Sequence, residues 1–383
     1  RLHPGTGDLM TPRDRRPDNE QGPVNWGIMP KKAPRAKTTA TRAGGNGLLE
    51  VVRSGNNPAP AGSVVSDASA VSATSAPGSA DGAAGPRDAG GTALIKSGTF
   101  GAAAGAYAWL TQGGTAQISG ARTTVKGGVM NPDSNAPEHR RGIVGGLAVI
   151  EDSAHSAALA KTTVTQSNVS IEGGSFTAPS GGKITFAGGA AYTRVDAANT
   201  ETVVTGNTAE ARWGKIAAAY GAYASIQQKN GAAQIFAEQN TATATRVATG
   251  TETFAGALID YERIFSASAP GNVTIKAKNN KAVLTDGTLK TLWGAKINVR
   301  NAFGGAAVYE ATENIVNVTA NFTGNVTGGV STTGAASRNI VNLGAVTVGG
   351  NVTGGQGVTT GLLHEGKFVF VQQPSFHGSA SFS

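Results

Sequence analysis

The sequence predicts an all-β protein in which short parallel strands stack into a β-solenoid, and three observations support this fold class. First, residues 314–318 read Asn-Ile-Val-Asn-Val, and residues 339–343 read Asn-Ile-Val-Asn-Leu. The shift of about 25 residues lies within the range of periods typical of stacked repeats. Second, apolar and polar residues alternate in several segments, and third, glycine is abundant. A single repeat cannot bury its own apolar face, so neighbouring repeats must stack to form a core.

Period-two alternation indicates extended strands in the repeat. Val316 and Val318 alternate with Asn317 and Thr319, and residues 273–278 repeat the pattern. Alternation that is rich in Val, Ile and Thr is typical of strands with one buried face. We therefore expect Val318 to point into the core and Thr319 to point to solvent.

The composition agrees with many short strands joined by turns. The chain has 55 glycines among 383 residues, which is about twice the average usage. Gly, Asn and Asp form tight turns at little steric cost. Residues 208–229 and 234–246 contain enough alanine for a helix, but their Thr, Tyr and Gly residues favour strands and turns.

A weaker form of the repeat extends upstream. Each instance has an apolar or aromatic residue, a small Gly/Ala cluster and a second apolar residue, at residues 100–107, 143–149, 186–192, 216–223, 254–258 and 303–309. The first two steps are each about 43 residues, which we interpret as two turns of a period in the low twenties. The later steps vary, as expected if loops of different length interrupt the stack.

Asparagines at equivalent positions of the C-terminal repeat predict side-chain ladders. Asn317 corresponds to Asn342, and Asn325 corresponds to Asn351. Stacked amides of this kind can each hydrogen-bond to the next layer.

The chain divides into three predicted regions. Residues 1–91 form a basic leader and a Pro/Ala/Ser/Gly-rich linker that we expect to be disordered, because periodic apolar residues are missing there. Residues 92–357 form the solenoid, and residues 358–383 form a C-terminal cap or tail. The net charge of +8 is concentrated in the leader, where a solvated arm is favoured over a nucleic-acid partner. No apolar run reaches the roughly 18 residues of a membrane helix, and no signal peptide is visible, so the chain is interpreted as a fragment or a processed form.

Two segments resemble repeats in the passenger domains of bacterial autotransporter adhesins. Residues 346–355 read Val-Thr-Val-Gly-Gly-Asn-Val-Thr-Gly-Gly, and residues 168–176 read Asn-Val-Ser-Ile-Glu-Gly-Gly-Ser-Phe. The resemblance covers roughly residues 98–357. It implies a right-handed parallel β-helix that is secreted through an outer-membrane barrel and displayed at the cell surface. The sequence departs from the family in lacking a C-terminal translocator of many strands, so the resemblance implies a passenger alone.

Motifs for common catalytic and cofactor chemistry are missing. The five histidines (His3, His139, His155, His364 and His377) are dispersed and none has metal-ligand spacing. Residues 361–367 fit the letters of a P-loop, but Phe368 replaces the required Ser or Thr and a strand follows. The chain has no cysteine, which excludes a disulfide-stapled scaffold. We expect no catalytic site, no cofactor and no metal.

One pair of carboxylates leaves an enzymatic alternative open. Asp260 and Glu262 flank Tyr261 and precede Arg263. Residues two apart on a strand share a face, so both carboxylates could reach one sugar. A solvated surface is the commoner explanation of such a pair.

Other polar positions carry weaker signals. Glu151, Asp152 and Asp286 are more isolated carboxylates. Asn-x-Ser/Thr sequences occur at Asn168, Asn272, Asn317, Asn321, Asn325 and Asn351. We interpret them as turn asparagines that precede strands, and not as glycan acceptors.

The sequence therefore predicts a non-enzymatic, secreted or surface-displayed bacterial β-helix that acts as an adhesin or structural scaffold outside the cell. Expected partners are a host or neighbouring cell surface or a glycan, with self-association possible, and with neither nucleic acid nor a membrane-spanning segment. The alternatives are a carbohydrate-active β-helix that uses Asp260 and Glu262, and a purely structural fibre.

Overall fold

The structure of the protein is a computed structural model. It describes residues 48–50, 64–67, 72–75, 91–95, 99–100, 102–110, 114–130, 139, 141–152, 159–176, 185–196, 199–264, 270–301, 306–357, 366–370, 375–376 and 380–381. The secondary structure of these residues consists of strands and turns without an α-helix. Within this described part, no helix has the length and apolar character needed to cross a membrane.

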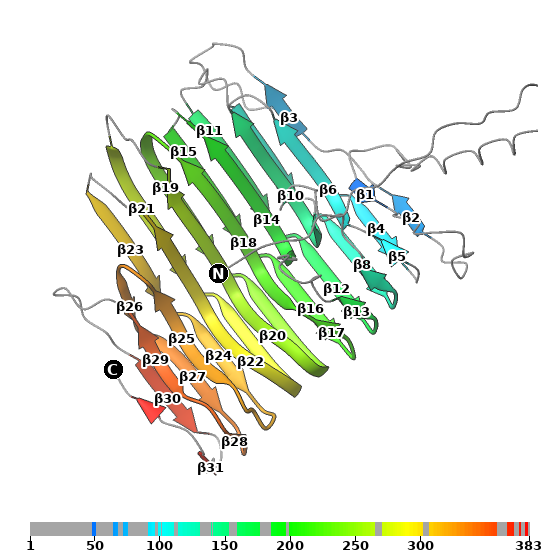
Figure 1. The fold of residues 1–383 in the computed structure, drawn as a ribbon, viewed down its shortest axis with the longest axis vertical. Helices are drawn as coiled ribbons and strands as arrows, with labels where there is room; N and C mark the ends of the chain where they lie inside the picture. Colours follow the sequence, from blue (N-terminus) through cyan, green and yellow to red (C-terminus); the bar gives the residue numbers. More distant parts are fainter. Residues whose placement is uncertain are drawn as a thin grey trace, which may run out of the picture. The chain divides into compact units, whose positions relative to one another are not determined.

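The strands follow one another in repeated coils (Figure 1). The first three coils are β4 (Thr92–Ile95), β5 (Thr99–Phe100), β6 (Ala102–Leu110) and β7 (Gly114–Ser119); β8 (Arg122–Lys126), β9 (Val129–Met130), β10 (Gly142–Asp152) and β11 (Leu159–Thr165); and β12 (Asn168–Glu172), β13 (Ser175–Phe176), β14 (Thr185–Val195) and β15 (Asn199–Thr205). The next three are β16 (Thr208–Arg212), β17 (Lys215–Ile216), β18 (Ala218–Gln228) and β19 (Gly231–Glu238); β20 (Thr241–Arg263) and β21 (Pro270–Lys278); and β22 (Lys281–Arg300) and β23 (Ala307–Thr312). The last three are β24 (Ile315–Val318), β25 (Asn325–Ser331) and β26 (Ala335–Ser337); β27 (Asn339–Leu343), β28 (Thr347–Val348) and β29 (Val352–Gln356); and β30 (Gly366–Phe370), β31 (Ser375–Phe376) and β32 (Ala380–Ser381).

Equivalent strands of successive coils pair in parallel and in register, which makes the fold a parallel β-helix and confirms the predicted fold class. Asn168 pairs with both Arg122 and Thr208, and Thr208 pairs in turn with Thr241. The described stack continues in parallel through β30–β32, beyond the predicted end of the solenoid at residue 357.

The coil length differs from the sequence interpretation in the first two-thirds of the stack. Ile143 and Phe186 are direct cross-strand neighbours, so the step between them is one coil and not two. Side-chain hydrogen bonds between one corner of successive coils span 40, 33, 40, 34 and 25 residues. The short period therefore holds only near the C-terminus. Upstream coils carry longer strands and longer connections, and parallel pairing tolerates both because loops lie outside the ladder.

Two apolar clusters fill the interior along the stack. One is lined by residues such as Phe176, Phe186 and Phe254. The other is largely alanine, with Ile259 and Ile297 among its larger members. Small side chains let the facing sheets approach closely, and burial of their apolar surface stabilises the fold by roughly 25 cal/mol per Å². The predicted facing is confirmed, because Val318 is fully buried and Thr319 is exposed.

A column of glycines explains the small-residue clusters in the upstream repeat. It contains Gly105, Gly145, Gly188, Gly221, Gly256, Gly294, Gly328 and Gly354, and the residues around it pair in register. A Cβ atom on Gly256 would lie 2.5 Å from the carbonyl oxygen of Gly294 and 2.5 Å from the backbone nitrogen of Lys281. Backbone of the adjacent coil occupies that space, so only glycine fits where the chain bends into the long strands.

Buried asparagines form a ladder at the corner that precedes β16, β20, β22, β24 and β27. Its members are Asn207, Asn240, Asn280, Asn314 and Asn339, all fully buried. Each Oδ1 atom accepts hydrogen bonds from the preceding coil, and each Nδ2 atom donates to a backbone carbonyl. The residue before each asparagine has a positive φ, as in Gln239 and Glu313. This ladder satisfies backbone groups that a sharp corner would otherwise leave unpaired.

The predicted ladders are also present. The Asn342 Nδ2 atom donates to the Asn317 Oδ1 atom at 2.8 Å, and the Asn351 backbone nitrogen donates to the Asn325 Oδ1 atom at 3.0 Å. The Asn321 side chain accepts a comparable bond from the Thr347 backbone nitrogen. Asn321 and Asn351 lie outside the strands and Asn325 begins β25, as expected of turn asparagines, whereas Asn317 lies within β24 and Asn272 within β21.

Three short strands precede the parallel stack, within the range predicted to be disordered. They are β1 (Leu48–Glu50), β2 (Val64–Asp67) and β3 (Ser72–Ser75), which pair antiparallel with β6, β4 and β7. Backbone pairing with an open sheet edge needs no apolar periodicity, and the disorder expected for residues 1–91 stays a prediction. The other residues of the predicted leader, apart from Gly91, lie outside the described residues.

Candidate functional site

The outer face of the long strands β10, β14, β18, β20 and β22 carries the most varied chemistry of the described residues. Alternate residues of these strands line the interior, so the residues between them point outward. An apolar cluster lies on this outer face and includes Leu147, Tyr192, Tyr223 and Leu258. The Tyr223 ring packs edge-on against Tyr192 at 5.4 Å and stacks with Tyr220 at 5.7 Å. Tyr192 and Tyr223 are buried, and Tyr107 and Tyr220 pack against this cluster in half-buried positions, beside the polar groups described next.

The structure confirms that Asp260 and Glu262 share a face. Both point outward from β20, whereas Tyr261 and Arg263 point into the interior and are 0% and 2% exposed. Burial raises the pKa of Tyr261 above its ordinary value, and the nearby Arg263 guanidinium opposes this rise. Tyr261 and Arg263 are therefore parts of the interior and are not available to a ligand on the outer face.

Asp260 is held by neighbours on two adjacent coils. Its Oδ2 atom accepts a hydrogen bond from the Tyr223 hydroxyl at 3.1 Å, and its Oδ1 atom accepts one from the Asn298 amide at 2.9 Å. Lys296, also on β22, lies 4.2 Å above the Trp293 ring. Burial lowers the pKa of Lys296, and the negative charge of Asp260 partly restores it. This group forms a compact polar network whose carboxylate already has two donors.

Glu262 is also paired. Its Oε2 atom accepts a hydrogen bond from the Gln227 amide at 3.1 Å and lies 3.6 Å from an Arg300 guanidinium nitrogen. Glu151, Arg194, Gln227, Glu262 and Arg300 occupy the same register on five successive coils. They form an outward stripe of charged and amide side chains, spaced by the 4.7–4.9 Å between strands.

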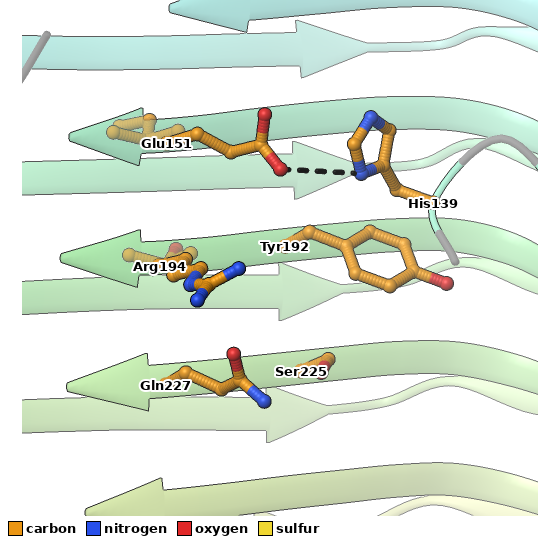
Figure 2. A pocket seen from close by; sticks show the side chains of 8 residues that line it. His139, Glu151, Tyr192, Arg194, Ser225 and Gln227 are labelled. Atoms are coloured by element: carbon orange, nitrogen blue, oxygen red, sulfur yellow. Dashed lines mark ion pairs between the residues drawn. The ribbon is translucent and has the colours of Figure 1, made fainter. Parts of the chain in front are cut away.

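A cleft opens at the N-terminal end of this stripe. Its volume is about 230 Å³, and it is lined by His139, Ile150, Glu151, Tyr192, Thr193, Arg194, Ser225 and Gln227. Figure 2 shows Glu151, Arg194 and Gln227 one above another on consecutive strands, with His139 and Tyr192 on the opposite side. The His139 Nδ1 atom lies 3.7 Å from the Glu151 carboxylate, and the His139 ring packs near Trp109 and Tyr192.

The remaining sequence candidates do not join this face. Asp286 is exposed and lies 3.4 Å from Arg246. The side chain of Asp152 and the other four histidines (His3, His155, His364 and His377) lie outside the described residues. Residues 361–365 of the P-loop-like segment also lie outside them, and residue 366 begins strand β30. The described residues contain no cluster of three or more potential metal ligands.

The sequence interpretation missed most of the residues that surround Asp260 and Glu262. Tyr223 and Gln227 come from one neighbouring coil, Lys296 and Asn298 come from the other, and Arg194 lies one coil further up the stripe. These residues are brought together by the pairing register of their strands. The sequence shows that register only when the length of each coil is known.

Comparison with known proteins adds no relative. No family model, curated protein or solved structure matches this chain.

Proposed function

We propose that this protein is a non-enzymatic β-solenoid that binds glycan along the outer face of its long strands and acts outside the bacterial cell as an adhesin or scaffold. The observation that carries the proposal is the combination of exposed or half-exposed aromatic rings with a polar stripe on one face. Aromatic rings offer apolar area to the faces of sugars, while amides and charged groups hydrogen-bond to hydroxyls. The passenger-like repeats support a secreted location.

The pairing of the carboxylates favours binding over hydrolysis. Glycoside hydrolysis needs one carboxyl group that donates a proton and a second that acts as base or nucleophile. Asp260 and Glu262 each accept hydrogen bonds from neighbouring side chains. These bonds engage both carboxylates with neighbouring side chains of the same face, whereas a catalytic pair must face the scissile bond of a substrate.

The test measures binding of the protein to a polysaccharide panel by affinity electrophoresis, together with the release of reducing ends. We expect binding to at least one polysaccharide without release. Trp109→Ala should weaken binding by about tenfold, equivalent to about 1.4 kcal/mol, because Trp109 is a 41% exposed ring beside the cleft. Trp213→Ala is the matched control, since Trp213 is 55% exposed but follows β16, outside the long strands. Absence of binding to the whole panel would refute the proposal.

A second candidate is a carbohydrate-active enzyme, and the lowered pKa of Lys296 beside Asp260 favours it. A half-buried lysine next to a carboxylate is a candidate general base. If the parent protein releases products from a polysaccharide, and both Lys296→Met and the double variant Asp260→Asn with Glu262→Gln abolish that release, the enzyme becomes the better account. We expect no release from the parent.

A further inference from the structure

The cleft on β10, β14 and β18 has the size of a site for one ring. Ligand pockets for drug-sized molecules measure roughly 300–1,000 Å³, and this cleft measures about 230 Å³. Its polar side chains come from three consecutive coils, so their spacing is fixed by the backbone ladder. The cleft therefore fits a single sugar residue of a longer chain.

One charged side chain of the cleft makes no ion pair with another described residue. Glu151 lies 3.7 Å from the buried His139. Arg194 is exposed, and its guanidinium makes no hydrogen bond or ion pair with any other described residue. In the register it lies between Glu151 and Gln227, and Figure 2 shows it in the same row. A guanidinium in this position can donate two parallel hydrogen bonds to a carboxylate.

The other polar groups suit hydroxyls. The Gln227 amide nitrogen donates to Glu262 at 3.1 Å, and its carbonyl oxygen accepts no hydrogen bond from another described residue. The Ser225 hydroxyl can both donate and accept. Tyr192 forms an apolar wall on the same side as His139 (Figure 2).

We propose that this cleft binds one sugar residue that carries a carboxylate, a uronic acid of the polysaccharide. Arg194 pairs with the carboxylate, Ser225 and Gln227 hydrogen-bond to ring hydroxyls, and Tyr192 packs against the carbon skeleton. This inference rests on the proposed glycan-binding function and specifies the class of sugar that the face selects.

The test compares uronate oligosaccharides with their carboxyl-reduced counterparts, which keep the same stereochemistry but are neutral. The probes are oligomers of galacturonate, mannuronate, guluronate and glucuronate, each titrated calorimetrically into the parent protein. We expect at least one acidic oligomer to bind tenfold or more tightly than its reduced form. Arg194→Gln should remove this preference, so that acidic and reduced oligomers bind alike, and Arg194→Lys should keep only part of it.

One control variant and the pattern of binding separate failure of the uronate site from failure of the proposed function. Arg212→Gln on β16 changes an exposed arginine away from the cleft and should leave the preference intact. If acidic and reduced oligomers bind equally, or if Arg194→Gln keeps the preference, the uronate site is refuted while glycan binding stands. If no oligomer and no polysaccharide binds, both the site and the proposed function are refuted.

Discussion

Removal of one asparagine from the buried ladder tests the reasoning on the fold most directly. In the parent protein, the Asn280 Oδ1 atom accepts hydrogen bonds from the Asn240 backbone nitrogen at 3.1 Å and from its Nδ2 atom at 2.9 Å. The Asn280 Nδ2 atom donates to the Ala237 carbonyl at 2.9 Å and to the Asn314 Oδ1 atom at 3.0 Å. Asn280→Ala removes all four bonds in a region that water does not reach.

The expected loss of unfolding free energy follows from the polar groups that lose the Asn280 side chain as a hydrogen-bond partner. The Asn314 Oδ1 atom keeps a bond from the Asn280 backbone nitrogen, and the Asn240 Nδ2 atom keeps one to the Val204 carbonyl. The Asn240 backbone nitrogen and the Ala237 carbonyl lose these side-chain partners. An unsatisfied buried group costs about 1–3 kcal/mol, so the variant should lose about 2–6 kcal/mol of unfolding free energy.

Amide hydrogen exchange is the appropriate assay, with the denaturation midpoint as a second measurement. A solenoid can open coil by coil, so a single global midpoint can hide a local effect. In Asn280→Ala, exchange should accelerate at the Asn240 amide and its neighbours and much less at the far coils.

The control is Asn342→Ala. Asn342 donates one bond to Asn317 in a half-buried position, where water can replace it. Its loss should cost no more than about 0.5–1.5 kcal/mol. Equal destabilisation by Asn280→Ala and Asn342→Ala would refute the argument that the ladder contributes to the unfolding free energy because it is buried.

Three further predictions concern facing, close approach and pH. Val318→Asp should destabilise the C-terminal coils by about 3–5 kcal/mol, while Thr319→Asp should leave the thermal denaturation nearly unchanged. Equal effects would refute the assignment of Val318 to the core and Thr319 to the solvent. Gly256→Ala should lower the melting temperature sharply, because its Cβ would lie 2.5 Å from backbone of the next coil, and Gly344→Ala, with contacts of 3.5 Å or more, should not. Burial raises the pKa of Tyr261 above its ordinary value of 10.0, so the folded state holds the phenol proton more tightly than the unfolded state. The stability is therefore complete below pH 10.0 and declines as the pH rises toward the raised pKa. Tyr261→Phe should flatten the loss of stability above pH 10 in denaturant titrations, and an unchanged slope would contradict the assignment.

Local periodicity was sufficient to predict the strands, their facing and the fold class. Val318 and Thr319 differ in burial as period two requires, and Asn317 and Asn342 stack as the repeat predicts. These features depend only on neighbouring residues or on two coils of equal length. Coil length was predicted wrongly upstream, because parallel pairing fixes register across strands and places no limit on the residues between them.

The main asparagine ladder was missed for the same reason. Its members are separated by 33 to 40 residues through most of the stack and by 25 only at the end. The local signal is a residue of positive φ followed by Asn, but that first residue is Gly206, Gln239 or Glu313 in different coils. A non-glycine residue at this position gives no indication of its conformation in the sequence.

The face proposed to bind glycan depends on the same variable coil lengths. Interior positions, the glycine column and the asparagine ladder are restricted by packing, so they vary little from coil to coil. Outward positions on the long strands are free of these restrictions, and there Glu151, Arg194, Gln227, Glu262 and Arg300 follow one another. A scaffold that needed only rigidity could repeat one residue along this stripe. The observed stripe instead places a carboxylate, a guanidinium or an amide on adjacent coils, as expected if successive residues of a bound polysaccharide meet different side chains.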